Sequence, residues 1–327
     1  MALGQDEGSA SKFAGAGWSA RPVGRRREDR IVGASRATER VIEQISAAAR
    51  SELPVLIVGP SGTGKEFAAR ATHFWGPRAD GPFVTLACDA LPEAIQAREI
   101  FGSASGASPA LTDAQEGALA RAAGGSLLLE HIDRLRGDVA ETLARAVAER
   151  RFRRAGDDAA IPLSARVLVA ADVRPAGTFL GGIPHHAIEL VPLAERREDI
   201  LPLAAHFLAS SAEEIGVQPV GFTADARAFL LAEVWPGNVR ELRQRIRQAV
   251  RLSAGGAVSA EALLLAGDGD EIPSFKEAKR AFETRYVVNL LRRCSGNISR
   301  AARLAKKDRK DFYDVIRRTG IDPTQFR

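Results

Sequence analysis

Long apolar runs and cysteine are both scarce in this sequence. No stretch approaches the roughly 20 apolar residues of a membrane-spanning helix, and the N-terminus lacks the apolar segment of a signal peptide. The two cysteines, Cys88 and Cys294, lie far apart without a CxxC pattern or a nearby His cluster, which excludes a disulfide framework and a zinc site. We therefore expect a cytoplasmic protein.

The composition is that of a globular protein with a small basic excess. Of 327 residues, 45% are hydrophobic and 27% charged, with a formal net charge of +5, which fits one large domain with smaller helical units. Basic residues concentrate at Arg25–Arg30 and Arg292–Arg318. A basic terminal unit is typical of nucleic-acid binding, although charge alone equally fits a solvated helix face.

Five short apolar runs alternate with helical segments after Ile31. The runs are Pro54–Val58, Phe83–Ala87, Ser126–Leu129, Arg166–Ala171 and Ala187–Val191. Polar or Gly-rich turns bound each of them. This alternation predicts an α/β domain over residues 31–193, with a parallel sheet covered by helices on both faces.

The remaining segments are predicted from composition and helical periodicity. Helices are expected at Asp199–Ile215, Thr223–Glu233 and Val239–Leu252, which indicates a helical lid over residues 194–266. Residues 267–274, reading GDGDEIPS, are typical of a linker that leads to a separate all-α unit over 275–327. Residues 1–30 are expected to be a flexible basic leader, with no receiver or ligand-sensing domain before Ile31.

The glycine-rich sequence GPSGTGK follows the first apolar run and precedes a helical segment. It fits the pattern GxxxxGK, in which backbone N–H groups and a Lys surround the phosphates of a nucleotide. A purely structural turn is the alternative, but the Lys in this context disfavours it. We expect ATP or ADP, with Mg²⁺ as a possible companion, at Gly59, Pro60, Ser61, Gly62, Thr63, Gly64, Lys65 and Glu66.

The sequence resembles the central domain of the sigma-54 activator family, the bacterial enhancer-binding AAA+ ATPases. The resemblance rests on GPSGTGKE with the following AARATHFWGPRADGPFVTLACDALPE, and on EIFG at 99–102, GGSLLL at 124–129, PLAERREDI at 192–200 and WPGNVREL at 235–242. It covers about Ile31 to Leu265. It implies a P-loop NTPase fold in which Arg240 approaches the phosphates from the lid and Ile31, Val32 and Gly33 line the base pocket.

The same resemblance implies that the hydrolysis machinery has decayed. The family's Asp-Glu pair reads Glu130 and His131 here, so that Glu130 can still serve Mg²⁺ while His131 is a weaker base in a different geometry. His131 is therefore either a replacement base or an inert, hydrogen-bonded or exposed histidine. The polar sensor Thr-Asn reads Asp172 and Val173. No arginine stands between Arg174 and Arg196, where the family carries its arginine finger.

The family's sigma-factor contact loop is also altered. Its motif GAFTGA reads GASPAL at residues 106–111, which lacks the Phe, the Thr and the second Gly, and Pro109 stiffens the tip. Together with the changes in the acidic pair, the sensor and the finger, the altered loop indicates a domain that no longer works as an ATP-driven motor.

The C-terminal segment shows the spacing of a helix-turn-helix. Helical periodicity over Phe275–Arg293 ends at Gly296-Asn297, and two short helices are expected at Ile298–Ala305 and Arg309–Arg318, the second capped by Asp308. Residues 296–321 resemble the Fis-type helix-turn-helix that closes many sigma-54 activators. The expected DNA-binding residues are Arg309, Lys310 and Tyr313 at the major groove or its phosphates, with Ser299, Arg300, Arg317 and Arg318 supporting backbone contacts.

These features predict a DNA-binding transcriptional regulator with a nucleotide-binding AAA+ domain that is defective in ATP hydrolysis and sigma-54 contact. Expected partners are double-stranded DNA, further copies of the chain in a dimer or ring, and RNA polymerase or a signalling protein. Two alternatives stay open, a working sigma-54 activator with variant motifs and a non-DNA scaffold in mixed rings. A helical dimerisation module is the alternative for the C-terminal unit.

Overall fold

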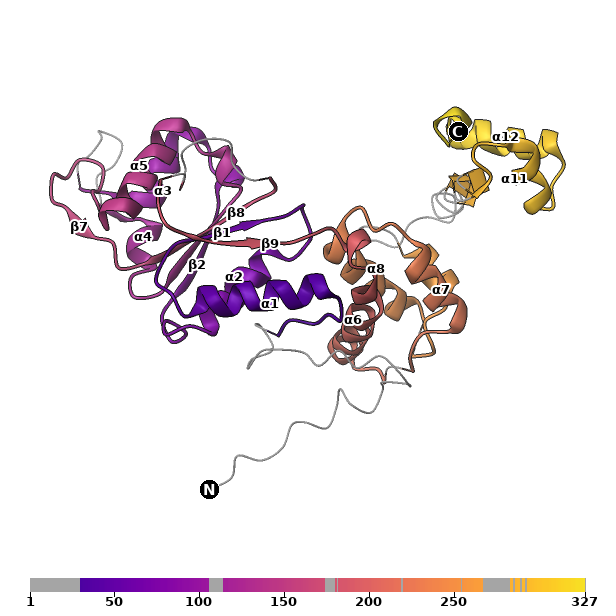
Figure 1. Ribbon diagram of the computed structural model, residues 1–327, viewed down its shortest axis with the longest axis horizontal. Helices are drawn as coiled ribbons and strands as arrows, with labels where there is room; N and C mark the ends of the chain where they lie inside the picture. Colours follow the sequence, from indigo (N-terminus) through magenta and orange to yellow (C-terminus); the bar gives the residue numbers. More distant parts are fainter. Residues whose placement is uncertain are drawn as a thin grey trace, which may run out of the picture. The chain divides into compact units, whose positions relative to one another are not determined.

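The chain folds into two compact units (Figure 1). The computed structural model describes residues 30–105, 114–173, 180, 182–218, 220–253, 255–266, 283–284, 286–288, 290–291 and 293–326. The first unit comprises Met1–His206 with Leu230–Arg243, and the second comprises Phe207–Phe229 with Gln244–Arg327. The leader, the GASPAL segment at 106–111 and the linker at 267–274 fall outside the described residues, apart from residue 30 of the leader.

A five-stranded parallel sheet forms the centre of the first unit. Its strands are β1 (Val55–Val58), β2 (Phe83–Ala87), β5 (Ser126–Glu130), β8 (Arg166–Ala171) and β9 (His186–Glu189). Their order is β2-β5-β8-β1-β9. The α/β class and all five strands are confirmed, and the bounds differ from the predicted ones by at most two residues.

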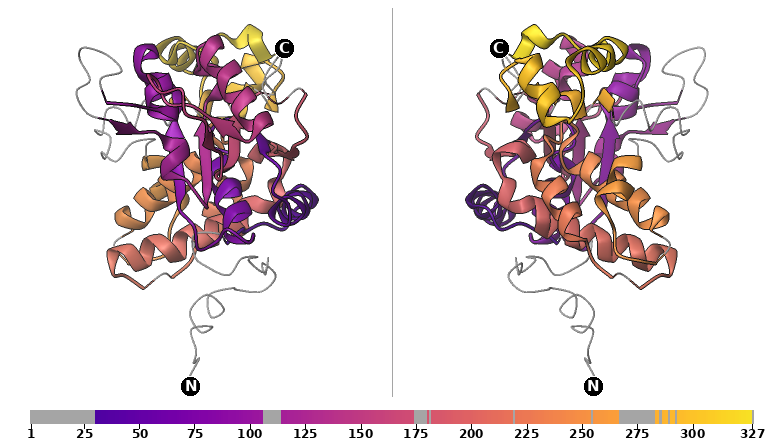
Figure 2. Two further views of the ribbon diagram at one scale, coloured as in Figure 1. Left: turned by 90° about the vertical axis from the view of Figure 1, so that its left-hand side faces the viewer. Right: turned by 90° about the vertical axis from the view of Figure 1, so that its right-hand side faces the viewer.

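Helices cover both faces of this sheet because successive strand residues point to opposite sides. Leu127 and Leu129 belong to one core cluster, which also contains Leu143 of α5 (Gly137–Glu149), whereas Leu128 belongs to another cluster with Ile45 of α1 (Arg36–Ala49). Figure 2 shows the strands between these helical layers. The helices of this unit's α/β part are α1 (Arg36–Ala49), α2 (Lys65–Phe74), α3 (Gln96–Phe101), α4 (Ala118–Arg121) and α5 (Gly137–Glu149).

Several short elements were not predicted. Two-residue strands form the antiparallel pairs β3 (Gly102–Ser103) with β4 (Gln115–Glu116) and β6 (Arg151–Phe152) with β7 (Ile161–Pro162). Two residues are too few for a periodic pattern. The short 3₁₀ helices are η2 (Cys88–Ala90), η3 (Glu93–Ile95), η4 (Ile132–Arg134), η5 (Leu193–Glu195), η6 (Arg197–Asp199) and η7 (Pro323–Phe326).

The segment after Pro192 is helical, as predicted. Its helices are α6 (Ile200–Ile215), α7 (Ala224–Ala232), α8 (Asn238–Leu252) and α9 (Ala260–Leu265). The first three lie within one residue of the predicted bounds, and α9 was missed because its six residues span less than two turns. One isolated parallel bridge joins Phe222 and Val258, so strand-like pairing does not stop entirely at Pro192.

Two helices, α11 (Ile298–Leu304) and α12 (Arg309–Thr319), form the C-terminal helix pair and pack around a small apolar core. Ala301 and Ala302 meet Phe312 and Ile316 in that core. The Asn297 side chain caps α11 by accepting from the Arg300 N–H at 3.0 Å. Asp308 stands at the N-cap of α12 but its side chain makes no capping hydrogen bond, so the expected cap is wrong in that respect.

The beginning of the predicted helix Phe275–Arg293 lies outside the described residues. Helical backbone is present at 283–284, 286–288, 290–291 and 293, and Leu291 and Cys294 are buried in the same core.

None of the described helices combines the length and the apolarity that a membrane crossing requires.

Gly125 is expected to tolerate no side chain. An added Cβ would lie 1.9 Å from the Pro82 carbonyl oxygen, where the chain enters β5 beside β2. We expect Gly125→Ala to lower the free energy of unfolding by about 1–3 kcal/mol, the usual cost of overpacking. Denaturant unfolding measures this change. Gly137→Ala is the matched control, because a Cβ there has no neighbour within 4 Å, and an equal loss in both variants would contradict the steric explanation.

Candidate functional site

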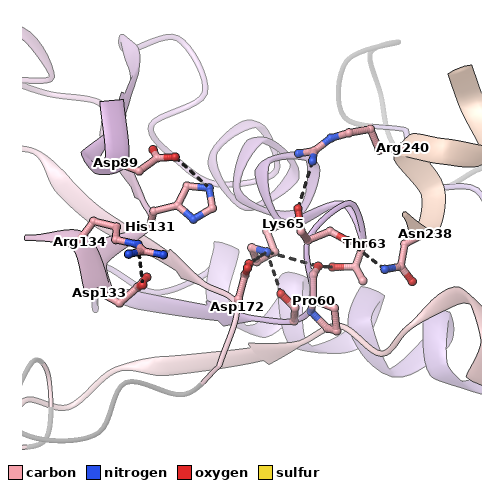
Figure 3. Close-up of polar contacts among 12 residues, drawn as sticks. Pro60, Thr63, Lys65, Asp89, His131, Asp133, Arg134, Asp172, Asn238 and Arg240 are labelled. Atoms are coloured by element: carbon pink, nitrogen blue, oxygen red, sulfur yellow. Dashed lines mark hydrogen bonds and ion pairs between the residues drawn. The ribbon is translucent and has the colours of Figure 1, made fainter. Parts of the chain in front are cut away.

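The loop Gly59–Lys65 connects β1 to α2 and is folded on itself (Figure 3). The Thr63 hydroxyl donates to the Pro60 carbonyl at 2.7 Å. Gly64 has a φ of 106°, a left-handed conformation that favours glycine, and directly precedes α2. A Cβ on Gly64 would have no atom within 4 Å, so the space at the helix N-terminus is open. Open space beside backbone N–H groups at a helix N-terminus suits an anion.

The Lys65 ammonium lies inside this loop. Its Nζ donates to the carbonyls of Gly59 at 2.7 Å and Pro60 at 3.3 Å, and to Asp172 Oδ1 at 2.6 Å. The adjacent Glu66 turns away toward Arg70, with Oε1 accepting from Nη2 at 2.8 Å. Lys65 lies in the predicted loop, and its contact with Asp172 was not predicted.

The carboxyl ends of three adjacent strands bring further side chains to the same sheet edge. Ala171 pairs with Val58, so Asp172 follows β8 at the level where the loop follows β1. Glu130 ends β5 and pairs with Ala170. Ligands of open α/β sheets bind outside this edge.

Glu130 and His131 occupy different environments at that edge. Burial, followed by the nearby negative charge of Glu66, raises the pKa of Glu130 above its usual value. His131 has a φ of 52°, and its Nε2 lies 3.9 Å from Asp89 Oδ2. Figure 3 shows the His131 ring directed at Asp89 rather than at Lys65. Among the described residues, no group of three His, Cys, Asp or Glu side chains gathers as a metal site.

The turn before α8 lies directly on the tip of the loop. Asn238 Nδ2 donates to the Ser61 carbonyl at 2.9 Å, and Asn238 Oδ1 accepts from the Leu193 N–H at 2.8 Å. Arg240 Nη1 donates to Ser61 Oγ at 3.1 Å. A Cβ on Gly62 would lie 2.2 Å from the Gly237 carbonyl oxygen, so only glycine permits this approach. Arg240 was expected here, whereas Asn238 was missed, although an Asn after Gly is a signal for a left-handed turn.

A buried carboxylate joins the predicted base-pocket segment to the lid side of the site. Asp199 is 0% exposed and accepts from the N–H groups of Ala34 and Ser35 at 2.6 and 2.7 Å, and from the hydroxyls of Ser35 and Thr38 at 2.8 and 2.7 Å. A Cβ on Gly33 would lie 2.9 Å from Asp199 Oδ1.

The segment Ile31–Gly33 precedes this anchor, and Ile31 packs against the core cluster shared by α1 and α2. Arg196 Nη2 donates to the Thr63 carbonyl at 2.9 Å, and burial lowers the pKa of its guanidinium. Arg196 and Asp199 thus connect the phosphate loop with Ala34 and Ser35. Both residues belong to the PLAERREDI segment, in which no local pattern indicates a role for either of them.

The predicted DNA-binding residues lie on the C-terminal helix pair. Arg309, Lys310, Tyr313 and Arg317 are exposed and, at 100° per residue, fall within about 100° of the circumference of α12, whereas Phe312 and Ile316 are buried. Asp311 and Asp314 are exposed outside this arc.

Ser299 lines a shallow hollow with Arg309, and Arg300 is exposed beside it. Arg318 Nη2 is held by Glu283 Oε1 at 2.8 Å.

Comparison with known proteins gives two family matches. Residues 31–180 match the sigma-54 interaction domain, and residues 194–271 match an AAA+ ATPase lid domain. The chain is 36% identical to the transcriptional regulatory protein GlrR of Escherichia coli K12, over 94% of this chain and 72% of that protein. It is also 34% identical to the C4-dicarboxylate transport transcriptional regulatory protein DctD of Pseudomonas aeruginosa, over 89% of this chain and 64% of DctD.

Solved structures of NtrX from Brucella abortus share the fold. The complex with ADP has a TM-score of 0.64 at 28% identity and covers 90% of this chain and 70% of NtrX. The complex with ATP has the same TM-score and identity and covers 89% of this chain and 70% of NtrX.

The raised pKa of Glu130 predicts a pH-dependent stability difference. A carboxyl whose folded pKa exceeds its unfolded pKa loses stability as pH rises through the folded value, because burial then disfavours the charged form. We expect Glu130→Gln to raise the thermal unfolding midpoint at about pH 8, and the gain to shrink toward about pH 4.

A control with the opposite sign is Glu52→Gln. The Arg78 hydrogen bond lowers the pKa of Glu52, so this carboxylate contributes stability above its unfolded pKa and loses it as pH falls. Its replacement should lower the midpoint at about pH 8. If the thermal unfolding midpoint of Glu130→Gln equals that of wild type at every pH, burial of the charged Glu130 carboxylate does not destabilise the protein, and the prediction is wrong.

Proposed function

The chain belongs to the sigma-54 interaction domain family of AAA+ transcriptional regulators, and we propose that it binds DNA and nucleotide without working as an ATP-driven motor. In this proposal the AAA+ domain binds ATP or ADP, with Mg²⁺ where Glu130 can reach it, and serves as a nucleotide-responsive or structural platform. ATP hydrolysis and sigma-54 contact are lost. The protein acts at the chromosome in the cytoplasm.

Nucleotide binding is supported by the intact phosphate loop. The residues from Gly59 to Lys65 connect β1 to α2, the space at Gly64 is open, and Arg240 approaches from α8. The related NtrX has been solved with ADP and with ATP. We assign the phosphates to this loop and the base to the neighbourhood of Ile31, Val32 and Gly33.

The observation that carries the loss of hydrolysis is the pair Glu130 and His131 at the end of β5. A general base must come within hydrogen-bonding reach of the attacking water. The His131 ring is instead directed at Asp89, which favours the inert role over that of a replacement base. Asp172 and Val173 replace the polar sensor, and the stretch between Arg174 and Arg196 lacks an arginine for a neighbouring subunit to use.

DNA binding is supported by the cationic arc of α12. Arg309, Lys310 and Arg317 carry three positive charges next to Tyr313, and the buried Phe312 and Ile316 anchor the adjoining side of the helix. Such a helix suits the major groove. Arg318 is held by Glu283 and is assigned a supporting role only. A dimer or ring of the chain would read a palindromic site, with RNA polymerase or a signalling protein as a further partner.

The first test measures nucleotide binding and steady-state ATP turnover on the same preparation, with and without DNA. We expect ATP or ADP to bind and Lys65→Ala to abolish binding, because that ammonium serves the outer phosphates. Turnover should equal that of Lys65→Ala, since an arginine finger alone is worth about 10³–10⁵ in rate. Turnover that depends on Lys65 would favour the alternative of a working sigma-54 activator.

The second test concerns DNA. A duplex selected from a random pool by the full chain should bind Arg309→Ala and Lys310→Ala about tenfold more weakly, and each lost phosphate contact should reduce the slope of log affinity against log salt by about 1. Fluorescence anisotropy at several salt concentrations measures both. Arg121→Ala is the control, since it removes an exposed arginine of α4. Absence of any sequence-selective, salt-dependent binding would favour the scaffold alternative.

A further inference from the structure

All three hydrogens of the Lys65 ammonium are already engaged. An ammonium has three donors, and those of Lys65 go to the Gly59 carbonyl, the Pro60 carbonyl and the Asp172 carboxylate. The shortest of these contacts is the charged one, at 2.6 Å, and the Lys65 side chain is only 10% exposed. The cation that serves outer phosphates therefore has a carboxylate as its counter-ion.

The fold fixes Asp172 at this place. It follows β8, and the parallel register that pairs Val58 with Ala171 sets it beside the start of the phosphate loop. Figure 3 shows Asp172 reaching Lys65 from below the loop while Arg240 approaches from the other side. Asp172 is 48% exposed, so its carboxylate borders the open space in which phosphates would lie rather than being buried beneath it.

The last phosphate of a triphosphate would approach an edge that already carries negative charge. Glu130 adds negative charge to that of Asp172, against the positive charges of Lys65 and Arg240. Glu66, which is ion-paired with Arg70, also disfavours the ionised form of Glu130, whereas Lys65 and Arg240 favour it. A diphosphate needs only the loop N–H groups and part of the Lys65 interaction. A third phosphate brings further negative charge toward Lys65, where Asp172 already lies, and like charges repel.

We propose that Asp172 is a specificity-determining residue that makes this site prefer a nucleoside diphosphate to the corresponding triphosphate. This inference rests on the nucleotide binding proposed above. It gives the acidic residue at the altered sensor position a role of its own: the chain rests in the diphosphate-bound form, and ATP displaces ADP only at a large excess.

The test compares equilibrium binding of ADP and ATP to the full-length chain by calorimetry, in EDTA and in Mg²⁺. In EDTA, wild type should bind ADP about tenfold more tightly than ATP. Asp172→Asn should bind ATP about tenfold more tightly than wild type and change ADP affinity by less than about threefold, because the repelling charge is removed. Asp172→Glu retains the charge and should retain the preference for ADP.

Asp133→Asn is the matched control. Asp133 is 49% exposed, lies near the same sheet edge just after β5, and pairs with Arg134 instead of Lys65. Its replacement should leave both affinities within about twofold of wild type. A similar gain for ATP in Asp133→Asn would mean that net charge alone acts, and would overturn the assignment to Asp172.

Three further outcomes would overturn the proposal. Equal affinities of wild type for ADP and ATP would leave the proposed function intact and remove this inference alone. Weaker ATP binding by Asp172→Asn in Mg²⁺ only would make Asp172 a metal ligand. Absence of nucleotide binding in wild type and all variants would refute the nucleotide-binding part of the proposed function, and this inference with it.

Discussion

The hydrogen bonds that the Asp199 carboxylate accepts are the interaction on which the arrangement around the phosphate loop depends. A fully buried charge is costly unless hydrogen bonds satisfy it, and Asp199 accepts four of them, from two backbone amides and two hydroxyls. These bonds hold the turn that begins α1, at Ser35 and Thr38, against the segment that leads into α6. Arg196, three residues earlier, continues the connection to Thr63 in the phosphate loop. The segment Ile31–Gly33 and the phosphate loop therefore share one anchor.

Around this anchor, the residues proposed to bind a nucleotide differ in arrangement from those at the positions where hydrolysis would take place. The loop from Gly59 to Lys65 keeps its glycines, its helix N-terminus and its contact with Asn238 and Arg240. At the ends of β5 and β8, by contrast, His131 is turned to Asp89 and Asp172 is joined to Lys65. Binding of phosphates by such a loop relies on backbone geometry, whereas hydrolysis relies on single side chains placed at the reacting atoms, so the proposed function separates the two.

In the C-terminal helix pair, the residues that pack in the core are different from the exposed cations. Apolar residues Phe312 and Ile316 fix α12 on α11, and the cations Arg309, Lys310 and Arg317 occupy the exposed side. The ion pair between Arg318 and Glu283 ties the end of α12 to the preceding helical segment. The proposed DNA contact therefore rests on residues of α12 that are exposed and carry no part of the core, namely Arg309, Lys310, Tyr313 and Arg317.

The sequence by itself determined the elements and the motif. Strands, helices and the phosphate loop carry local signals, because periodicity and glycine spacing act within about ten residues. The two-residue pairs β3–β4 and β6–β7 and the six-residue α9 are too short for such signals. Only the tertiary structure decided the partners of Lys65, Ser61 and Ser35, which lie 107, 177 and 164 positions away in Asp172, Asn238 and Asp199. Those pairings follow from strand order, register and the return of the helical segment to the loop, and no local pattern encodes a distance between residues so far apart in the chain.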